Sequence, residues 1–231
     1  MTNAMILAAG RGKRMRPLTD HRPKPLLKVA GQPLIARHLE SLARAGCETV
    51  VVNVAWLGEQ LRSYLGDGSA WGLRVVISDE GDEGLETAGG IVRALPWLGD
   101  APFWIINGDI WTDFELASLP RRPPGLGHLV LVDNPPHHPE GDFLLRGSRV
   151  TNRGEQPGLT YAGIASFSPD LFAGCSEEMA PLGPLLRAAG NRGQLTGIHH
   201  RGEWFDVGTP ERLAFVDDVV RRHADAERAP R

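Results

Sequence analysis

Short apolar runs alternate with amphipathic segments through the first half of the chain. Runs of five or six apolar residues are typical of strands that are buried on both faces, and they are predicted at residues 5–9, 49–54, 74–78 and 102–107. Between them, apolar residues recur at helical spacing over residues 34–45, 57–65 and 87–95. Strands joined by helices form parallel crossover units. The pattern therefore predicts an α/β fold with a mostly parallel, twisted sheet flanked by helices.

The second half has a different character. Proline, glycine and histidine accumulate between residues 119 and 158. Short strands are predicted at residues 129–132, 143–145, 163–167 and 194–199, with a helix near 182–189. A final helix is predicted to begin at Pro210 with Thr209 as its N-cap, and the tail after Arg221 is expected to be frayed. We expect a smaller, partly antiparallel subdomain in this half.

The length of the chain bounds its organisation. With 231 residues, of which 42% are hydrophobic, it can bury one sizeable core, whereas two domains of full size would not fit easily. We therefore predict a single domain over 1–231 with three parts, 1–118, 119–200 and 201–231. No internal repeat is apparent.

A basic loop with two glycines follows the first predicted strand. Gly10 and Gly12 allow backbone N–H groups to point at a ligand, and four cations surround them: Arg11, Lys13, Arg14 and Arg16. Such a loop suits a polyanion, because backbone dipoles and side-chain charges act together on phosphate oxygens. It lacks the Walker A and dinucleotide-binding spacings, and an ordinary turn with solvated charges is the alternative interpretation.

Two aspartates are candidates for a metal site. Asp109 directly follows the predicted strand 102–107, and Asp206 lies just ahead of the final helix. Ligands of open parallel sheets gather at the carboxyl ends of the strands. Magnesium binds through one or two carboxylates together with phosphate oxygens and water. The pair therefore predicts a Mg²⁺ site, although each aspartate alone also fits a turn or a charge near a helix terminus.

The order of these residues resembles the signature of the sugar-1-phosphate nucleotidyltransferases. The matching segments are Leu7-Ala-Ala-Gly10, Gly12, Arg14-Met15, Pro17-Leu18-Thr19, Pro23-Lys24-Pro25, Asn107-Gly-Asp109 and Trp204 to Thr209. The resemblance implies a Rossmann-like nucleotide-binding core over 1–118, a sugar-binding part over 119–200, and a metal-binding turn and helix over 201–231. It also implies a catalytic set of Arg14, Lys24 and Asp109, with Asp109 and Asp206 as the metal ligands. Arg14 would hold the departing phosphates, and Lys24 would neutralise the phosphate under attack.

The resemblance also indicates the nucleotide contacts. Residues 79–90 leave a predicted strand and enter a helix, and the matching family segment lines the base and the ribose. Glu80, or alternatively Asp79, is expected to accept a hydrogen bond from a pyrimidine N3–H, while a plain helix start capped by Thr87 is the other interpretation. The expected nucleotide contacts are Leu7, Ala9, Gly10, Arg11, Gly12, Arg14, Lys24, Glu80, Thr87, Gly89 and Asn107.

The sugar side departs from the family pattern. Relatives commonly carry Glu-Lys-Pro, whose lysine grips the sugar phosphate, where this chain has Glu155-Gln156-Pro157. Arg201 is the candidate replacement, because a guanidinium can bind a phosphate through two hydrogen bonds. A solvated surface arginine fits this position as well. The expected sugar contacts are Asp142, Glu155, Gly163 and Arg201. His137-His138 lack further zinc ligands and are interpreted as a polar turn.

Several segments also resemble one subgroup, the N-acetylmuramate α-1-phosphate uridylyltransferases, which serve cell-wall recycling. They are Leu131 to Pro135, His137-His138, Gly141 to Phe143, Asn53-x-Ala-Trp56 and Leu85 to Thr87. The implied partners are UTP and a sugar 1-phosphate, whose oxygen attacks the α-phosphorus in line while pyrophosphate leaves. Glucose or mannose 1-phosphate is the alternative substrate. A non-catalytic regulator that binds nucleotide sugars is the alternative class.

Net charge and cysteine content restrict the binding partners and the cellular compartment that we expect for this protein. The net charge of −3 provides no global basic field for nucleic acid or an anionic membrane. Cys47 and Cys175 are far apart and are expected to be core thiols. Without an apolar signal region or an eighteen-residue apolar run, we expect a cytoplasmic protein. No C-terminal β-helix, the usual trimerisation device, is expected, which leaves a monomer or a weak dimer.

Overall fold

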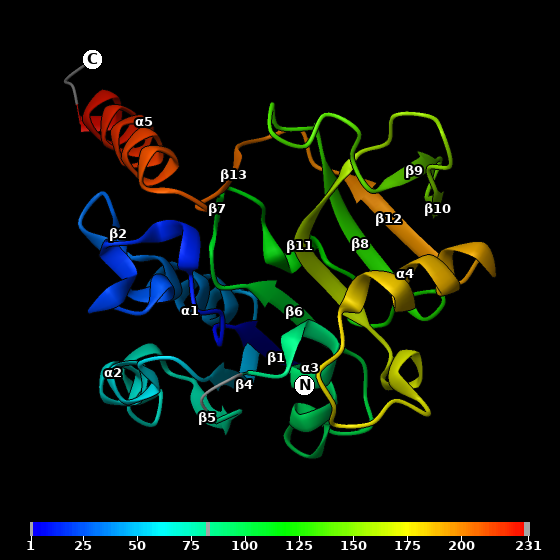
Figure 1. Cartoon of the computed structure of the whole chain (residues 1–231), viewed down its shortest axis with the longest axis horizontal. Coiled ribbons are helices and arrows are strands. Elements are labelled where there is room, and N and C mark those ends of the chain that lie inside the picture. The colour runs from blue at the N-terminus through cyan, green and yellow to red at the C-terminus, as the bar shows by residue number, and fades with distance from the viewer. Residues whose placement is uncertain (1, 82–83, 229–231) are drawn as a thin grey trace.

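One large sheet runs through the molecule. In the computed structural model, which describes residues 2–81 and 84–228, it has nine strands in the order β5-β4-β1-β6-β11-β8-β12-β10-β9 (Figure 1). The strands are β1 (Thr2–Leu7), β4 (Cys47–Val54), β5 (Arg74–Asp79), β6 (Phe103–Asn107), β8 (Gly127–Val132), β9 (Phe143–Arg146), β10 (Arg149–Asn152), β11 (Thr160–Phe167) and β12 (Leu195–His199). Strands β10 and β11 run opposite to the others. The predicted α/β class with a mostly parallel sheet is confirmed.

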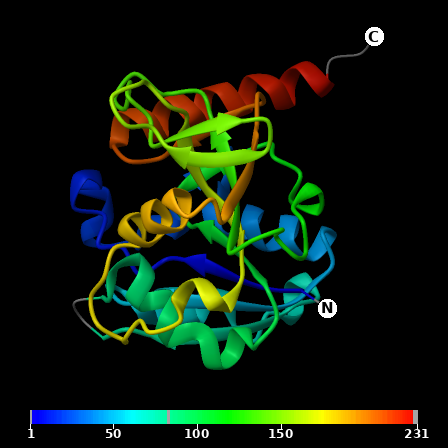
Figure 2. The same cartoon turned by 90° about the vertical axis from the view of Figure 1, so that its right-hand side faces the viewer.

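Helices cover both faces of this sheet, and two short ribbons complete the fold (Figure 2). The helices are α1 (Leu34–Arg44), α2 (Gly58–Leu65), α3 (Glu86–Leu98), α4 (Leu182–Asn191) and α5 (Pro210–Arg228). One ribbon pairs β2 (Lys28–Val29) with β3 (Gln32–Pro33), and the other pairs β7 (Ile110–Thr112) with β13 (Trp204–Asp206). The β7–β13 ribbon matters most for function, because it joins two segments that lie far apart in the sequence.

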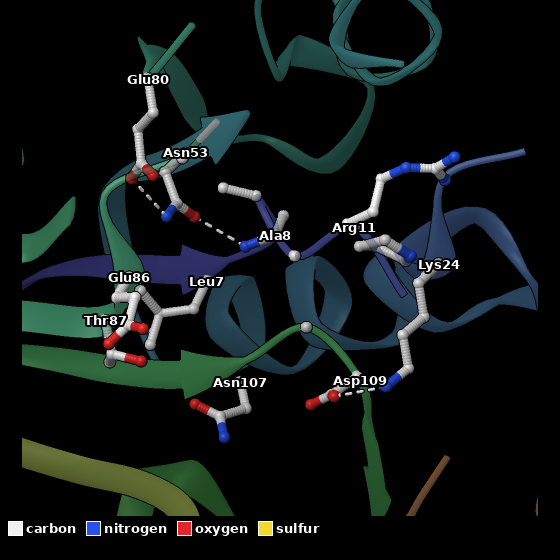
Figure 3. A pocket seen from close by; sticks show the side chains of 15 residues that line it. Leu7, Ala8, Arg11, Lys24, Asn53, Glu80, Glu86, Thr87, Asn107 and Asp109 are labelled. Atoms are coloured by element: carbon white, nitrogen blue, oxygen red, sulfur yellow. Dashed lines mark hydrogen bonds and ion pairs between the residues drawn. The ribbon is translucent and has the colours of Figure 1, made fainter. Parts of the chain in front are cut away.

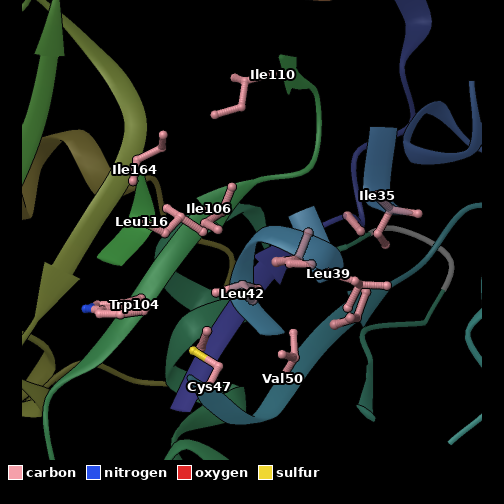
Figure 4. Packing of buried hydrophobic residues seen from close by; sticks show 14 of the residues in the cluster. Ile35, Leu39, Leu42, Cys47, Val50, Trp104, Ile106, Ile110, Leu116 and Ile164 are labelled. Carbon is pink, nitrogen blue, oxygen red and sulfur yellow. The ribbon is translucent and has the colours of Figure 1, made fainter. Parts of the chain in front are cut away.

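Alternation along the strands creates two hydrophobic cores. Ile6 packs under α1 and α2 on one face, whereas its neighbour Met5 packs under α3 on the other. Figure 4 shows the first core, where Leu39 and Leu42 of α1 contact the sheet beside Ile106. Burying a side chain of this kind stabilises the fold by about 1.5–3 kcal/mol. These cores fix the strand ends from which the candidate site is built.

A third, smaller core anchors the basic loop. Met15 of that loop packs with Trp111 of β7 and with Val216 and Val220 of α5, and all four are buried. Hydrophobic contact between these segments gives the loop a fixed seat against the β7–β13 ribbon. Helix α5 therefore contributes to the site by holding its parts together.

Several predicted boundaries differ from the structure. The first strand ends at Leu7 and not at residue 9, and α3 continues through Pro96 to Leu98. The frayed tail was a wrong prediction, since α5 runs to Arg228. The short strands of the β7–β13 ribbon were not predicted, because such brief segments carry little periodicity.

The described residues test the cysteine predictions and show which helices could span a membrane. Cys47 is buried, and burial raises the pKa of its thiol to about 12, as expected for a core thiol. Cys175 is partly exposed, so the prediction of a core thiol was wrong there. No helix in the described ranges is long and apolar enough to cross a membrane. The division at residues 118 and 200 remains a prediction.

Candidate active site

A cavity of about 300 Å³ opens at the carboxyl ends of the parallel strands (Figure 3). This is the edge where ligands of open α/β sheets gather. Nine residues predicted from the sequence line it: Leu7, Ala9, Gly10, Arg11, Lys24, Glu80, Thr87, Asn107 and Asp109. Most of the expected nucleotide contacts therefore share one space.

The basic loop is braced from the side. The guanidinium carbon of Arg11 lies 3.4 Å from the ring centroid of Trp56, and its Nη1 donates to the Thr19 carbonyl at 3.2 Å. The Trp56 indole donates to the same carbonyl at 3.0 Å. A cation over an indole ring is attracted by the π electrons. Arg11 is thus held in place, with backbone N–H groups of the loop beside the cavity.

Two predicted loop residues lie outside the cavity lining. Gly12 has φ +64°, and a Cβ there would lie 3.0 Å from Thr19 Cγ2, so the glycine shapes the turn. Arg14 lies on the 3₁₀ turn Lys13–Met15 and is exposed. Its expected contact with the phosphates stays a prediction.

Lys24 and Asp109 form an ion pair at the mouth of the cavity. Lys24 Nζ lies 2.5 Å from Asp109 Oδ2, and the lysine side chain is only 10% exposed against 41% for the aspartate. Gly108 makes this approach possible. Its N–H donates to the Leu7 carbonyl at 2.8 Å, and a Cβ would lie 2.7 Å from that oxygen. A larger residue at position 108 would push Asp109 away from β1.

The β7–β13 ribbon brings Asp206 beside Asp109. Asp206 pairs with Ile110 in the antiparallel register, and the Val207 N–H donates to the Asp109 carbonyl at 2.8 Å. The two aspartates predicted to hold a metal are therefore neighbours in the fold. Within the described residues, no group of three or more His, Cys, Asp or Glu side chains is arranged to hold a metal. Any ion bound here would draw its other ligands from substrate and water.

Two side chains that were not predicted to lie at this site contact Asp206. Arg212 Nη1 lies 2.5 Å from Asp206 Oδ2, and His137 Nε2 lies 3.1 Å from Asp206 Oδ1. Arg212 Nη1 also lies 2.6 Å from His137 Nε2. Gly208 leaves room for the guanidinium, since a Cβ there would lie 2.1 Å from Arg212 Nη2. Arg212 could have been identified from the sequence by its position in the first turn of α5, six residues after Asp206.

Asn53 is a second residue whose role the sequence did not reveal. It is only 3% exposed; its Oδ1 accepts from the Ala8 N–H at 2.6 Å, and its Nδ2 donates to Glu80 Oε1 at 2.7 Å (Figure 3). Glu80 Oε2 accepts from the Leu85 N–H at 2.8 Å. A polar residue inside an apolar strand needs internal partners, and this was the missed signal. Asp79, the alternative to Glu80, pairs instead with Arg62 and does not line the cavity.

The start of α3 differs from the expected cap. The helix begins at Glu86, which has φ +55° and lines the cavity, and Thr87 does not cap it. A left-handed glutamate is a strained backbone that the surrounding structure must hold, and such strain clusters at functional sites. Gly89 lies outside the cavity lining: a Cβ there would be 2.2 Å from the Glu178 carbonyl oxygen. This glycine permits close packing of α3 against residues 178–180.

The expected sugar contacts are dispersed. Asp142 accepts from the Tyr161 N–H at 2.8 Å and pairs with His138 at 3.1 Å. Gly163 has φ +75°, and a Cβ there would lie 2.5 Å from Asn107 Nδ2, so it lets β11 pass beside Asn107. Glu155 and Arg201 are exposed, and neither makes a side-chain hydrogen bond or ion pair within the described ranges.

The paired histidines lie in a turn region, as predicted, but each also contacts an aspartate. His137 contacts Asp206, and His138 contacts Asp142. The turn therefore links the second half of the chain to the ribbon that carries the predicted metal ligand. This link joins residues about seventy positions apart, which no local pattern predicts.

Comparisons with known proteins identify the family of this chain. The model of the nucleotidyl transferase family matches residues 3–143. An N-acetylmuramate alpha-1-phosphate uridylyltransferase of Neisseria meningitidis is 50% identical over 91% of this chain and 94% of the relative. A protein of the same name from Caulobacter vibrioides is 37% identical over 90% of this chain and 92% of the relative.

A solved structure extends the likeness to the fold. A crystal structure from Bacillus anthracis, described as a glucose-1-phosphate thymidylyltransferase, has a TM-score of 0.83 and covers 96% of both chains. Its sequence is 18% identical, so this likeness shows the fold alone. The matched family model and the two similar sequences confirm the family that the sequence resembles. The chain belongs to the nucleotidyl transferase family.

Proposed function

We propose that this protein transfers the uridylyl group of UTP to N-acetylmuramate α-1-phosphate, releasing pyrophosphate. The observation that carries the proposal is the single cavity shared by the basic loop, the Lys24–Asp109 pair and the Asn53–Glu80 clamp. The names of the two similar proteins support the choice of substrates. A role in cell-wall recycling in the cytoplasm follows as an expectation.

The base would lie against the Asn53–Glu80 clamp. Each Glu80 oxygen already accepts one hydrogen bond from the protein, and each keeps a second lone pair. Glu80 can therefore accept from a base N–H while its orientation stays fixed. The N3–H of uracil is such a donor, whereas cytosine carries no hydrogen at that atom.

The triphosphate would lie along the basic loop. Gly10 and Arg11 line the cavity, and exposed Arg14 would reach the phosphates that leave. Lys24 would neutralise charge on the α-phosphate; preorganised groups of this kind contribute about 3–4 kcal/mol to transition-state stabilisation. The protein thus supplies position and charge and no covalent nucleophile.

Asp109 and Asp206 fit a magnesium ion. They offer two carboxylates from adjacent backbone positions, and Mg²⁺ takes one or two protein carboxylates together with phosphate oxygens and water. When bound, the ion would offset the repulsion between the two anionic substrates.

The reaction would be a direct displacement. An oxygen of the sugar 1-phosphate forms a bond to the α-phosphorus while the bond from that phosphorus to the bridging oxygen breaks, and pyrophosphate leaves with the electron pair. The sugar phosphate and the UTP must be held in line for this attack, and positioning of this kind can supply much of the rate enhancement.

Arg212, and not Arg201, is the better candidate to replace the lysine that relatives carry in Glu-Lys-Pro. Its guanidinium lies on Asp206 and His137, next to the predicted metal site, whereas Arg201 is exposed. A guanidinium can bind a phosphate through two parallel hydrogen bonds. Asp142 would complete the sugar side from the neighbouring turn. We expect the protein to act as a monomer or a weak dimer.

A matrix assay tests the proposal. The purified protein is incubated with Mg²⁺ and each pairing of UTP, dTTP or GTP with N-acetylmuramate, glucose or mannose 1-phosphate, and released pyrophosphate is measured. We expect the highest kcat/KM for UTP with the muramate phosphate. Turnover only with another pair would overturn the specificity, and absence of turnover with every pair, in a protein that still binds UTP, would favour the regulator.

A further inference from the structure

A second cavity, of about 290 Å³, lies between α1 and β7. Its lining shares no residue with that of the candidate active site. Its floor is formed by Ile106, Ile110, Leu116 and Ile164, which belong to the first hydrophobic core and are each at most 4% exposed. This cavity adjoins the catalytic machinery from the opposite side, because Ile106 and Ile110 flank the segment that carries Asn107 and Asp109.

The rim of this cavity is positively charged. Arg37, Ser41 and Arg44 follow one another at spacings of four and three residues, which places them on one stripe of α1. In the part of the chain that the structure describes, neither arginine forms an ion pair. Glu40 also lies at the rim, but its carboxylate accepts a hydrogen bond from Gln32 at 2.5 Å. The rim therefore carries two guanidinium groups and one carboxylate, and that carboxylate already has a hydrogen-bond partner.

Arg37 is held toward the cavity by an aromatic ring. Its guanidinium carbon lies 5.1 Å from the ring centroid of Trp111, and burial lowers the pKa of Arg37 from its ordinary value. Burial of a cation is unfavourable, and the neighbouring Glu40 offsets it only in part, so a bound anion would be stabilised here. The side chain is positioned by α1 and β7 before any ligand arrives.

Two polar atoms in the wall have no protein partner. His38 Nε2 and Trp111 Nε1 are buried and make no hydrogen bond within the described residues, and both side chains are only 6% exposed. Most buried polar atoms in proteins are satisfied, and an exception calls for an explanation. The indole N–H donor of Trp111, beside a cationic rim, would suit an oxygen atom of an anionic ligand.

We propose that this second cavity binds a small organic carboxylate, with its anionic group at Arg37 and Arg44 and an apolar body on the isoleucine floor. Binding would be transmitted to the candidate active site through β7. Ile110 is adjacent to Asp109 and pairs with Asp206, so a shift of β7 moves both carboxylates. This second step rests on the proposed function, whereas binding itself does not.

The test uses 4-(trifluoromethyl)phenylacetate as a ¹⁹F NMR probe, compared with the uncharged 2-[4-(trifluoromethyl)phenyl]ethanol. We expect the acid to bind at least tenfold more tightly than the alcohol. Arg37→Met should weaken acid binding about tenfold, since the charge-assisted bond is lost, and Ser41→Phe should abolish it by filling the cavity. Arg74→Met, which removes an exposed cation of β5 outside the cavity, should leave binding unchanged.

Several outcomes would overturn the site. They are absence of binding, equal affinity of acid and alcohol, unchanged binding in both folded variants, and displacement of the probe by UTP with Mg²⁺. A bound probe that leaves the KM for Mg²⁺ unchanged would overturn the coupling to the active site. An enzyme inactive with every substrate pair would count against the proposed function and would leave the binding result standing.

Discussion

The two halves of the molecule hold their candidate contacts in different ways. On the nucleotide side, buried hydrogen bonds and close backbone contacts fix the site, as Asn53 does between Ala8 and Glu80. On the sugar side, Glu155 and Arg201 are exposed, and Asp142 is half-buried and pairs with His138. Under the proposed function, the nucleotide would therefore meet a preformed wall. The sugar would meet side chains with fewer fixed contacts.

The largest effect should come from Asp109, which pairs with Lys24 and lies beside Asp206 of the second half. In Asp109→Asn, Lys24 loses its charged partner and the predicted metal site loses one carboxylate, so we expect turnover to fall about 100-fold or more. The measurement is kcat by pyrophosphate release. Asp113→Asn, which alters a nearby carboxylate paired with His200, is the matched control and should retain most activity. Equal losses in both variants would remove the special role of Asp109.

The buried histidine of the first half provides a stability test. Burial lowers the pKa of His38 to about 4, from an ordinary value near 6.5, so the unfolded chain binds the proton more readily. Stability should therefore fall as pH drops from 6.5 to 4, by about 3 kcal/mol from this group. Urea unfolding of wild type and His38→Leu across this range measures the difference. An identical pH dependence in the two proteins would contradict the assignment.

Loss of the Asn53 hydrogen bonds should have a smaller effect. It should lower both the stability of the protein and its affinity for UTP. Asn53→Ala leaves the Ala8 N–H and part of Glu80 without a partner, which should lower the free energy of unfolding by about 2 kcal/mol and raise the KM for UTP. Asn3→Ala removes a single bond to the Leu98 carbonyl at the far end of β1 and serves as the control. If the KM for UTP changed equally in both, the clamp would have no role in binding the base.

The smallest effect is expected for Arg212, a candidate contact on the sugar side. Arg212→Met should raise the KM for the sugar phosphate about tenfold, because a charge-assisted hydrogen bond is lost, with little change in the KM for UTP. Arg201→Met should leave both values near those of wild type. Steady-state kinetics with each substrate varied in turn separates the two. A larger effect in Arg201→Met would restore the assignment made from the sequence.

Local patterns predicted much of the nucleotide side, and distance along the chain explains what they missed. The Leu7–Gly10 segment and Asp109 stand directly after apolar strands, so their place at the sheet edge follows from periodicity alone. Arg212 and His137 lie 75 residues apart, and only the fold brings them together. The sequence therefore identified the fold and most residues that line the first cavity, but it could not identify the cation beside Asp206.

The pairing of β6 with β11 restricts how the molecule can move. In the described sheet, β11 joins the parallel half to the rest through four paired positions, from Ile164 with Ile106 to Phe167 with Phe103. A rotation that separates the two halves would break the continuous hydrogen-bonded pairing of β6 with β11. We therefore expect substrates to enter and products to leave through rearrangement of surface segments such as the turn around His137, while the central sheet stays closed throughout the catalytic cycle.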